Sequence, residues 1–298
     1  MSSTKRSVRI GDPAPEFILQ DAGGEMVRFS EYRGKRVLLF IWASTCFSRH
    51  QLSGWQSFYQ KHREEGLELI GICLDVMGPQ QASHFLEEAK VSFRNLFDPC
   101  GSVWDLLGIR MTPAGFYIDE TCRVRYLKAN NFEVSDSTTL KIMEDLVAEK
   151  WSKKIPKPPE KNLSSKKQEV ADLTRQIKAS SRLLGKRFRL AELFLFTGQP
   201  RKALKEVETI RSHNPRSLRS FYLEGVIHCY ERRPDLAVVC WRRGLQLAPS
   251  NWILRRQLWA MESPMQFYPV INLEWQKEQL RLEELQASQR PQVKAQRR

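Results

Sequence analysis

Residues 36–50, with the sequence RVLLFIWASTCFSRH, constrain the fold more than any other stretch of this chain. Arg36–Trp42 is an almost continuous apolar run, which is typical of a central strand buried on both faces. Ser44 and Thr45 then offer side-chain oxygens that can cap a helix, and from Cys46 onward apolar and aromatic residues recur at helical spacing. The stretch therefore predicts a strand, a tight turn and a helix with a cysteine at its N-terminus.

Further strands and helices are expected on the C-terminal side of this stretch. The predicted strands lie over 67–74, 93–97, 115–118 and 123–127, and the predicted helices over 81–89, 103–107 and 140–151. Strands that alternate with helices and end in a hairpin predict an α/β sandwich with a mixed sheet.

The basic residues are concentrated in the C-terminal half. Of the net charge of +14, residues 1–150 contribute −2 and the remainder contributes +16. A surface of this charge attracts acidic partners, so we expect a protein partner or an acidic peptide to bind the C-terminal half. Nucleic acid is disfavoured as a partner, because the basic residues are not interleaved with aromatic residues that could stack on bases.

The cysteine pattern and the apolar content exclude several classes. The six cysteines form no Cys-x-x-Cys pair and no paired Cys/His spacing, so free thiols and no metal site are expected. There is no glycine-rich phosphate loop, and no cofactor is predicted. The N-terminus lacks the apolar core of a signal peptide, and no run of about 18 apolar residues occurs. We therefore expect a cytoplasmic protein without a membrane span.

A Pro- and Lys-rich segment divides the chain. Residues 152–168 are predicted to be a basic linker between a first domain, 1–151, and a helical domain, 169–298. Within the helical domain Ala203 and Pro215 recur 34 positions later as Ala237 and Pro249. Small residues at repeat positions 8 and 20 with proline at 32 are the tetratricopeptide pattern, because small residues let paired helices approach and proline ends the second helix. The two repeats are placed near 184–217 and 218–251, between flanking helices expected over 169–184, 252–261 and 272–288 and before a basic tail.

Three motifs in the first domain resemble a known family. They read GDPAPEF, FSEYRGKRVLLFIWASTC and LFDPCGSVWDLLGIRMTPAGFYIDETCRV, in this order, within residues 11–130. This region resembles the redoxin family, which joins TlpA/ResA-like thiol-disulfide oxidoreductases and alkyl hydroperoxide reductase/peroxiredoxin proteins. The resemblance implies a thioredoxin-like mixed-sheet sandwich, followed here by an all-α domain similar to tetratricopeptide proteins.

The resemblance also implies four candidate catalytic residues. Cys46 stands where the family has its first active-site cysteine, and Arg49 stands where it has the second. Pro113, after Thr112, stands at the place of a cis-proline that turns the preceding backbone toward an extended substrate. Without a second cysteine, a mixed disulfide on Cys46 needs an external thiol, such as glutathione or a thioredoxin-like protein, for release.

Within this resemblance a thiol-dependent oxidoreductase with antioxidant or thiol-disulfide exchange activity is the leading interpretation. Arg49 and His50, on the same helical face as Cys46, would favour the thiolate. Peroxide chemistry of the peroxiredoxin type is disfavoured, because Ala43 and Leu39 occupy positions where that branch has Thr or Ser and proline. The alternative is a catalytically inactive scaffold for protein–protein interaction, since loss of the second cysteine is also what a pseudo-enzyme would show.

Other thiols and imidazoles are secondary candidates. Cys73 and Cys100 are possible resolving thiols, although core packing is favoured for both, and Cys122 is expected to be exposed in a turn. His62 and His84 are expected at the surface.

Overall fold

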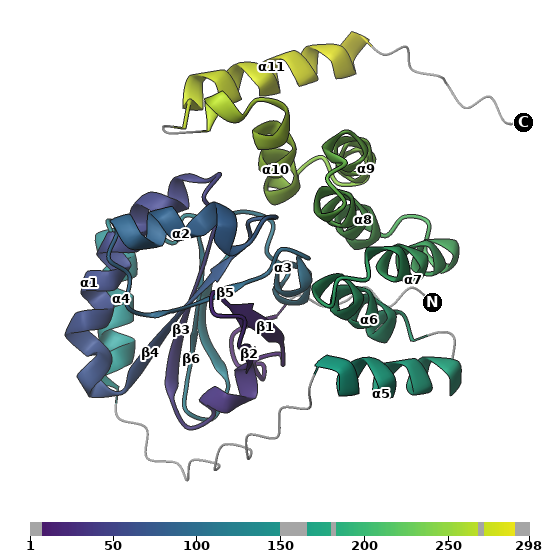
Figure 1. The fold of residues 1–298 in the computed structure, drawn as a ribbon. Coiled ribbons are helices and arrows are strands. Elements are labelled where there is room, and N and C mark those ends of the chain that lie inside the picture. Colours follow the sequence, from purple (N-terminus) through teal and green to yellow (C-terminus); the bar gives the residue numbers. More distant parts are fainter. Residues whose placement is uncertain (1–7, 150–165, 180–182, 268–270, 290–298) are drawn as a thin grey trace, which may run out of the picture.

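The computed structural model describes residues 8–149, 166–179, 183–267 and 271–289, and Figure 1 shows their arrangement. The N-terminal half forms a mixed sheet with flanking helices, and the C-terminal half is helical. Most of the predicted linker lies outside the described residues. Helix α5 begins at Lys166, within the C-terminal end of that predicted linker.

The sheet has seven strands in the order β2-β1-β5-β4-β3-β6-β7. Strands β3, β4 and β5 are parallel to one another, whereas β6 pairs antiparallel with β3 and β7 pairs antiparallel with β6. This arrangement confirms the predicted thioredoxin-like mixed sheet. The strands are β1 (Ile18–Asp21), β2 (Met26–Arg28), β3 (Arg36–Trp42), β4 (Leu67–Cys73), β5 (Arg94–Phe97), β6 (Ala114–Ile118) and β7 (Val124–Lys128).

The central strand β3 is buried on both faces, as its apolar run predicts. Leu38, Phe40 and Trp42 pack in one hydrophobic cluster with residues of α1 (Leu52–His62) and α4 (Ser137–Ala148). The alternate residues Leu39 and Ile41 belong to a second cluster, which continues through α3 (Ser102–Leu107) into the helical half. Figure 1 shows α1 and α4 on one side of the sheet and α3, beside α6 and α8, on the other. The helical half therefore covers a face of the sheet.

The helical half contains two successive helix hairpins. Helices α6 (Leu184–Phe196) and α7 (Pro200–His213) form the first, and α8 (Leu218–Tyr230) and α9 (Pro234–Leu247) the second. Each helix of the second hairpin starts 34 residues after its counterpart, which agrees with the predicted period; the tetratricopeptide identity itself stays a prediction. The remaining helices are α2 (Pro79–Glu88), α5 (Lys166–Ala179), α10 (Trp252–Glu262) and α11 (Leu273–Gln289).

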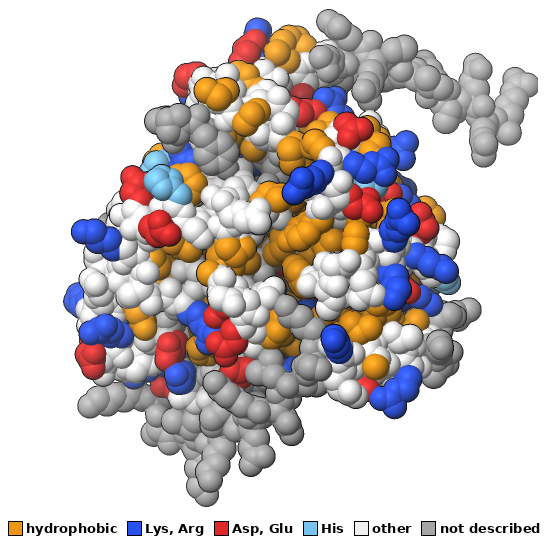
Figure 2. All heavy atoms as spheres, viewed as in Figure 1, with side chains coloured by type: hydrophobic (Ala, Val, Ile, Leu, Met, Phe, Trp, Pro, Cys, Tyr) orange, Lys and Arg blue, Asp and Glu red, His pale blue; other side chains and the backbone are white. Residues whose placement is uncertain are grey.

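An apolar contact joins α3 to the second hairpin. The ring centroids of Trp104 and Tyr222 lie 4.4 Å apart. Gly101, which precedes α3, has a positive φ, and a Cβ there would lie 2.8 Å from Trp104 and 3.0 Å from Tyr222. Only glycine combines this backbone conformation with so close an approach. Figure 2 shows hydrophobic side chains gathered where the sheet region meets the helices.

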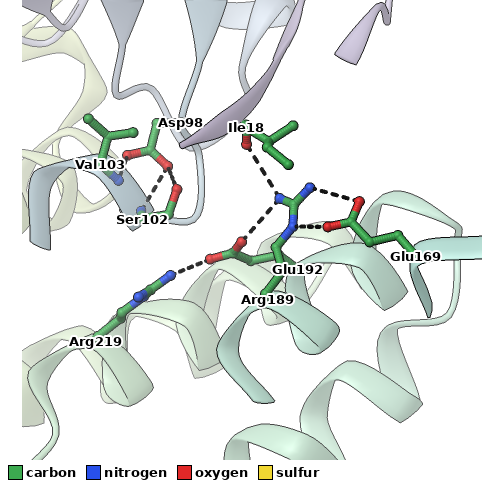
Figure 3. Close-up of polar contacts among 8 residues, drawn as sticks. All are labelled: Ile18, Asp98, Ser102, Val103, Glu169, Arg189, Glu192 and Arg219. Carbon is green, nitrogen blue, oxygen red and sulfur yellow. Dashed lines mark hydrogen bonds and ion pairs between the residues drawn. The ribbon is translucent and has the colours of Figure 1, made fainter. Parts of the chain in front are cut away.

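A group of ion pairs among helices of the C-terminal half lies at the boundary with the sheet (Figure 3). Arg189 of α6 donates to the Ile18 carbonyl over 3.4 Å and pairs with Glu169 of α5 over 2.9 Å. Glu192 lies between Arg189 and Arg219 and pairs with both. Arg189, Glu192 and Arg219 therefore each have a partner of opposite sign, which offsets the cost of removing these charges from water.

Candidate active site around Cys46

Cys46 follows β3 and is itself the N-cap of a short 3-10 helix over Phe47–Gln51, which leads into α1. Its sulfur accepts a hydrogen bond from the Ser48 amide over 3.5 Å. The prediction that Ser44 or Thr45 caps this helix was wrong. The Ser44 amide instead donates to both carboxylate oxygens of Asp75, over 3.0 and 3.1 Å, which fixes the turn between β3 and the helix.

The structure brings three of the predicted site residues together. The peptide bond between Thr112 and Pro113 is cis. The Cys46 thiol donates to the Thr112 carbonyl over 3.1 Å. The sulfur therefore lies against the backbone that immediately precedes the cis-proline.

The fourth predicted residue, Arg49, is buried beside this group, and its neighbours differ from those expected. Its Nη1 donates to the Ser44 carbonyl over 3.0 Å and to the Phe267 carbonyl over 3.1 Å. Its guanidinium also lies 4.8 Å from the ring centroid of Phe85. These contacts show Arg49 joining the Cys46 turn to the segment after α10. The expected contribution of His50 to the thiolate is weakened, because burial and the nearby Arg49 charge lower the pKa of His50 and leave it neutral.

The guanidinium that contacts the sulfur belongs to a residue that the sequence did not single out. Nη1 of Arg256, on α10, donates to the Cys46 sulfur over 2.6 Å. The two residues are 210 positions apart, and no local pattern distinguishes Arg256 from the many other basic residues of the C-terminal half. A net charge of +16 in that half was the only available indication.

Helix α10 lies across the loops that carry the site. The Trp252 amide donates to the Arg110 carbonyl over 3.1 Å, and the Gln257 side chain donates to the Leu74 carbonyl over 3.0 Å. These acceptors belong to the loops before β6 and after β4. The cover is nearly complete, because only 1% of Cys46 is exposed.

The other thiols near the sheet are poor nucleophiles. Burial, followed by the Asp75 charge, raises the pKa of Cys73 well above its ordinary value, and burial raises the pKa of Cys100 in the same way. Both thiols are therefore protonated at neutral pH, and since the thiolate is the reacting species, neither is a ready resolving thiol. Cys122 is half-buried instead of exposed, and His62 is buried against Phe58 instead of lying at the surface.

One group of side chains among the described residues has the composition of a metal site. Ligand atoms of Glu224, His228 and Cys240, from α8 and α9, lie within 4.8 Å of one another. Glu224 is already ion-paired with Arg211, and burial together with Glu224 raises the pKa of Cys240 to about 12. A protonated thiol and a neutralised carboxylate are poor metal ligands, so we interpret the group as internal packing.

Comparison with known proteins places the sheet region in a family. Residues 10–127 match the AhpC/TSA family. These residues form an AhpC/TSA domain. The resemblance to thiol-disulfide oxidoreductases and peroxiredoxins is thus confirmed for this domain. The helical half lies outside the match.

Named relatives of the AhpC/TSA domain come from both branches of the resemblance. Thiol-disulfide oxidoreductase ResA of Oceanobacillus iheyensis is 30% identical over 124 residues, which cover 40% of this chain and 64% of that protein. Chloroplastic peroxiredoxin Q of Triticum aestivum is 30% identical over 149 residues, covering 46% of this chain and 67% of that protein. Among solved structures, a putative thiol:disulfide interchange protein DsbE from Chlorobium tepidum is 26% identical, with a TM-score of 0.43, and covers 48% of this chain and 98% of its own. The relatives agree with the expected thiol-dependent oxidoreductase. Within the described part of the chain, no helix has the length and apolarity needed to cross a membrane.

Proposed function

We propose that this chain is a thiol-dependent redox protein in which the Cys46 sulfur is the reacting atom. The observation that carries the proposal is the contact between this sulfur and the Thr112 carbonyl, directly before the cis bond to Pro113. This geometry places a cysteine at the start of a helix, opposite a backbone segment on which an extended substrate could dock. The helix N-terminus also favours a negative charge on the sulfur.

The proposed reaction uses a single cysteine of the chain. The Cys46 thiolate attacks a substrate disulfide, a new S–S bond forms, the old one breaks and one substrate thiolate leaves. With a hydroperoxide, an S–O bond forms, the O–O bond breaks and an alcohol or water leaves, so that the sulfur becomes a sulfenic acid. Because Arg49 occupies the second-cysteine position and Cys73 and Cys100 are buried and protonated, an external thiol such as glutathione or a thioredoxin-like protein completes the cycle.

The helical half is proposed to select the protein partner. Together with the linker it carries the +16 charge of residues 151–298, and its paired helices follow the predicted 34-residue period. An acidic protein or peptide is the partner that this charge favours. Free cysteines are compatible with a reducing compartment, and we propose a cytoplasmic location.

The second candidate is a scaffold without activity. The near-complete burial of Cys46 under α10 favours this candidate, because a substrate needs access to the sulfur. In that case the AhpC/TSA domain would serve as a structural unit and the helices as the binding surface.

Turnover assays on the full chain separate the two candidates. Wild type should reduce insulin disulfides or hydrogen peroxide with glutathione or thioredoxin as the electron donor, and Cys46→Ser should fall to the uncatalysed rate. Cys122→Ser, which removes a half-buried thiol beyond the end of β6 opposite to the Thr112–Pro113 bond, is the control and should retain the wild-type rate. Equal rates for wild type and Cys46→Ser would favour the scaffold.

A further inference from the structure

We propose that Arg256 is a catalytic residue of the Cys46 centre, so that the helical half completes an active site which the AhpC/TSA domain carries only in part. The inference rests on the proposed role of Cys46. It adds a residue from outside the AhpC/TSA domain and assigns α10 a chemical role in addition to its structural one.

The first support is the contact itself. Nη1 of Arg256 lies 2.6 Å from the Cys46 sulfur, and the guanidinium is permanently charged at neutral pH. A charge-assisted hydrogen bond in a buried site stabilises the anionic form of its acceptor. The Thr112 carbonyl acts in the opposite direction, since it accepts a hydrogen bond that only the protonated thiol can donate. Arg256 is thus the group that offsets the negative charge on the sulfur when the thiol loses its proton.

The second support is a difference between the two adjacent arginines on α10 in whether each has a carboxylate partner. Arg255 pairs with the Glu283 carboxylate and donates to the Pro249 carbonyl over 2.7 Å. Arg256 has no carboxylate within ion-pair distance among the described residues, and its buried Nε lacks a hydrogen-bond partner there. Its remaining contact is with the Trp252 ring, whose centroid lies 5.4 Å away. A half-buried guanidinium with a buried, unpartnered Nε and no carboxylate beside it lacks a counterion, and the Cys46 thiolate is the anion within its reach.

The third support is the placement of the other charged groups around the sulfur. Arg49 donates to two backbone carbonyls, and the lowered pKa of His50 leaves it neutral. Asp75 faces the Ser44 amide, and its pKa is raised to about 6 by burial, so that its charge above this pH opposes a thiolate. Arg49 is the cation whose charge acts on Asp75, whereas Arg256 is the cation in direct contact with the sulfur.

The fourth support is the fixed position of α10. Trp252 and Gln257 lie before and after Arg256 on α10. The Trp252 amide donates to the Arg110 carbonyl and the Gln257 side chain donates to the Leu74 carbonyl, and these two bonds anchor the helix. A donor that is held in place before the reaction requires little reorganisation when charge develops on the sulfur. In the proposed cycle the thiol proton passes to water, Arg256 keeps its own proton, and the thiolate delivers its electron pair to the substrate sulfur or oxygen.

The test measures alkylation of Cys46 by iodoacetamide against pH in the full chain, with the adduct located by mass spectrometry. The plateau rate at high pH reports access to the sulfur, and the pH of the half-maximal rate reports thiolate formation. Arg256→Gln should move this pH upward by about one unit, which corresponds to roughly a tenfold slower alkylation at pH values below both midpoints after correction for the plateau. Arg256→Lys keeps the positive charge and should lie between Arg256→Gln and wild type.

The matched control is Arg255→Gln, which removes the neighbouring arginine of the same helix and leaves the contact with the sulfur. It should keep the wild-type profile. An unchanged half-maximal pH in folded Arg256→Gln overturns the role of Arg256 while the proposed function stands. If Cys46 of the wild type is not alkylated at any pH, both the role of Arg256 and the proposed function are overturned. If Arg256→Gln does not fold, the folded Arg256→Lys decides, because this variant keeps the positive charge. A half-maximal pH in Arg256→Lys as high as that of a free cysteine thiol would contradict the role of the charge.

Discussion

At the scale of single residues, Asp75 makes the stability of the fold depend on pH. This carboxyl is buried, and burial raises its folded-state pKa from 3.8 to about 6, against hydrogen bonds from Ser44 and Cys73. Between pH 4 and 6 the folded chain therefore binds more protons than the unfolded chain, and the free energy of unfolding falls as the pH rises through this window. Asp75→Asn should weaken this dependence, and urea unfolding at pH 4, 5, 6 and 7 measures it.

Part of the pH dependence should remain in Asp75→Asn, because burial also raises the pKa of Asp98 to about 6. Asp145→Asn, at an exposed ion pair with Lys141, is the control and should follow wild type. A variant Asp75→Asn with the full wild-type slope between pH 4 and 6 would show that Asp75 is ionised in the fold at far lower pH.

At this scale the sequence identified candidate site residues whose neighbours are close in the chain or are implied by the family resemblance. Cys46, Thr112 and Pro113 come together as the resemblance implies. Arg256 could not be found, because its role depends on where α10 lies on the sheet region, and neither periodicity nor composition contains that information. Arg49 was singled out for its position after Cys46, but its hydrogen bonds go to the Ser44 and Phe267 carbonyls.

At the scale of helices and strands, the second helix hairpin depends on a close approach between its two helices. Gly225 of α8 faces Trp241 of α9, and a Cβ at this glycine would lie 2.1 Å from the indole Nε1. The same nitrogen donates to the Tyr222 carbonyl over 3.0 Å, so the ring cannot move without losing a buried hydrogen bond. We expect Gly225→Ala to lower the free energy of unfolding by about 1–3 kcal/mol despite the higher helix propensity of alanine.

Gly185→Ala is the matched control for this prediction. A Cβ at Gly185, at the start of α6, meets no atom within 4 Å, so the substitution should be neutral or stabilising by up to about 1 kcal/mol. Thermal or urea unfolding of both variants measures the difference. Equal effects at the two glycines would mean that the second hairpin is more loosely packed than the structure indicates.

Element boundaries were predictable to the extent that they depend on local chemistry. Apolar runs predicted the central strands, and the prolines at the starts of α7 and α9 lie 34 residues apart, as the period requires. The 3-10 geometry after Cys46 was missed, since both the amide and the side chain of Ser44 are hydrogen-bonded to Asp75 from the neighbouring loop and the cysteine sulfur acts as the cap. Such tertiary hydrogen bonds override local capping preference.

At the scale of the whole molecule, the helical half controls access to the sulfur. Gln257, one of the residues that anchor α10, is buried and donates to the Leu74 carbonyl. Gln257→Ala should weaken this anchor and speed the reaction of Cys46 with a maleimide on a polymer of about 5 kDa more than its reaction with iodoacetamide. Gln246→Ala, at an exposed position on α9, should change neither rate. An equal increase for both reagents in Gln257→Ala would mean that α10 does not act as the barrier.

The contact between Cys46 and α10 also couples the two halves thermodynamically. A mixed disulfide or sulfenic acid adds atoms to a sulfur that already touches Arg256 and the Thr112 carbonyl, so the oxidised chain favours arrangements in which α10 has withdrawn. Linkage is reciprocal: a partner that binds the helices better after this withdrawal must shift the oxidation equilibrium of Cys46 toward the oxidised form by the same factor by which oxidation raises the affinity of that partner. The redox state of the Cys46 sulfur would then change how strongly the helices bind this partner.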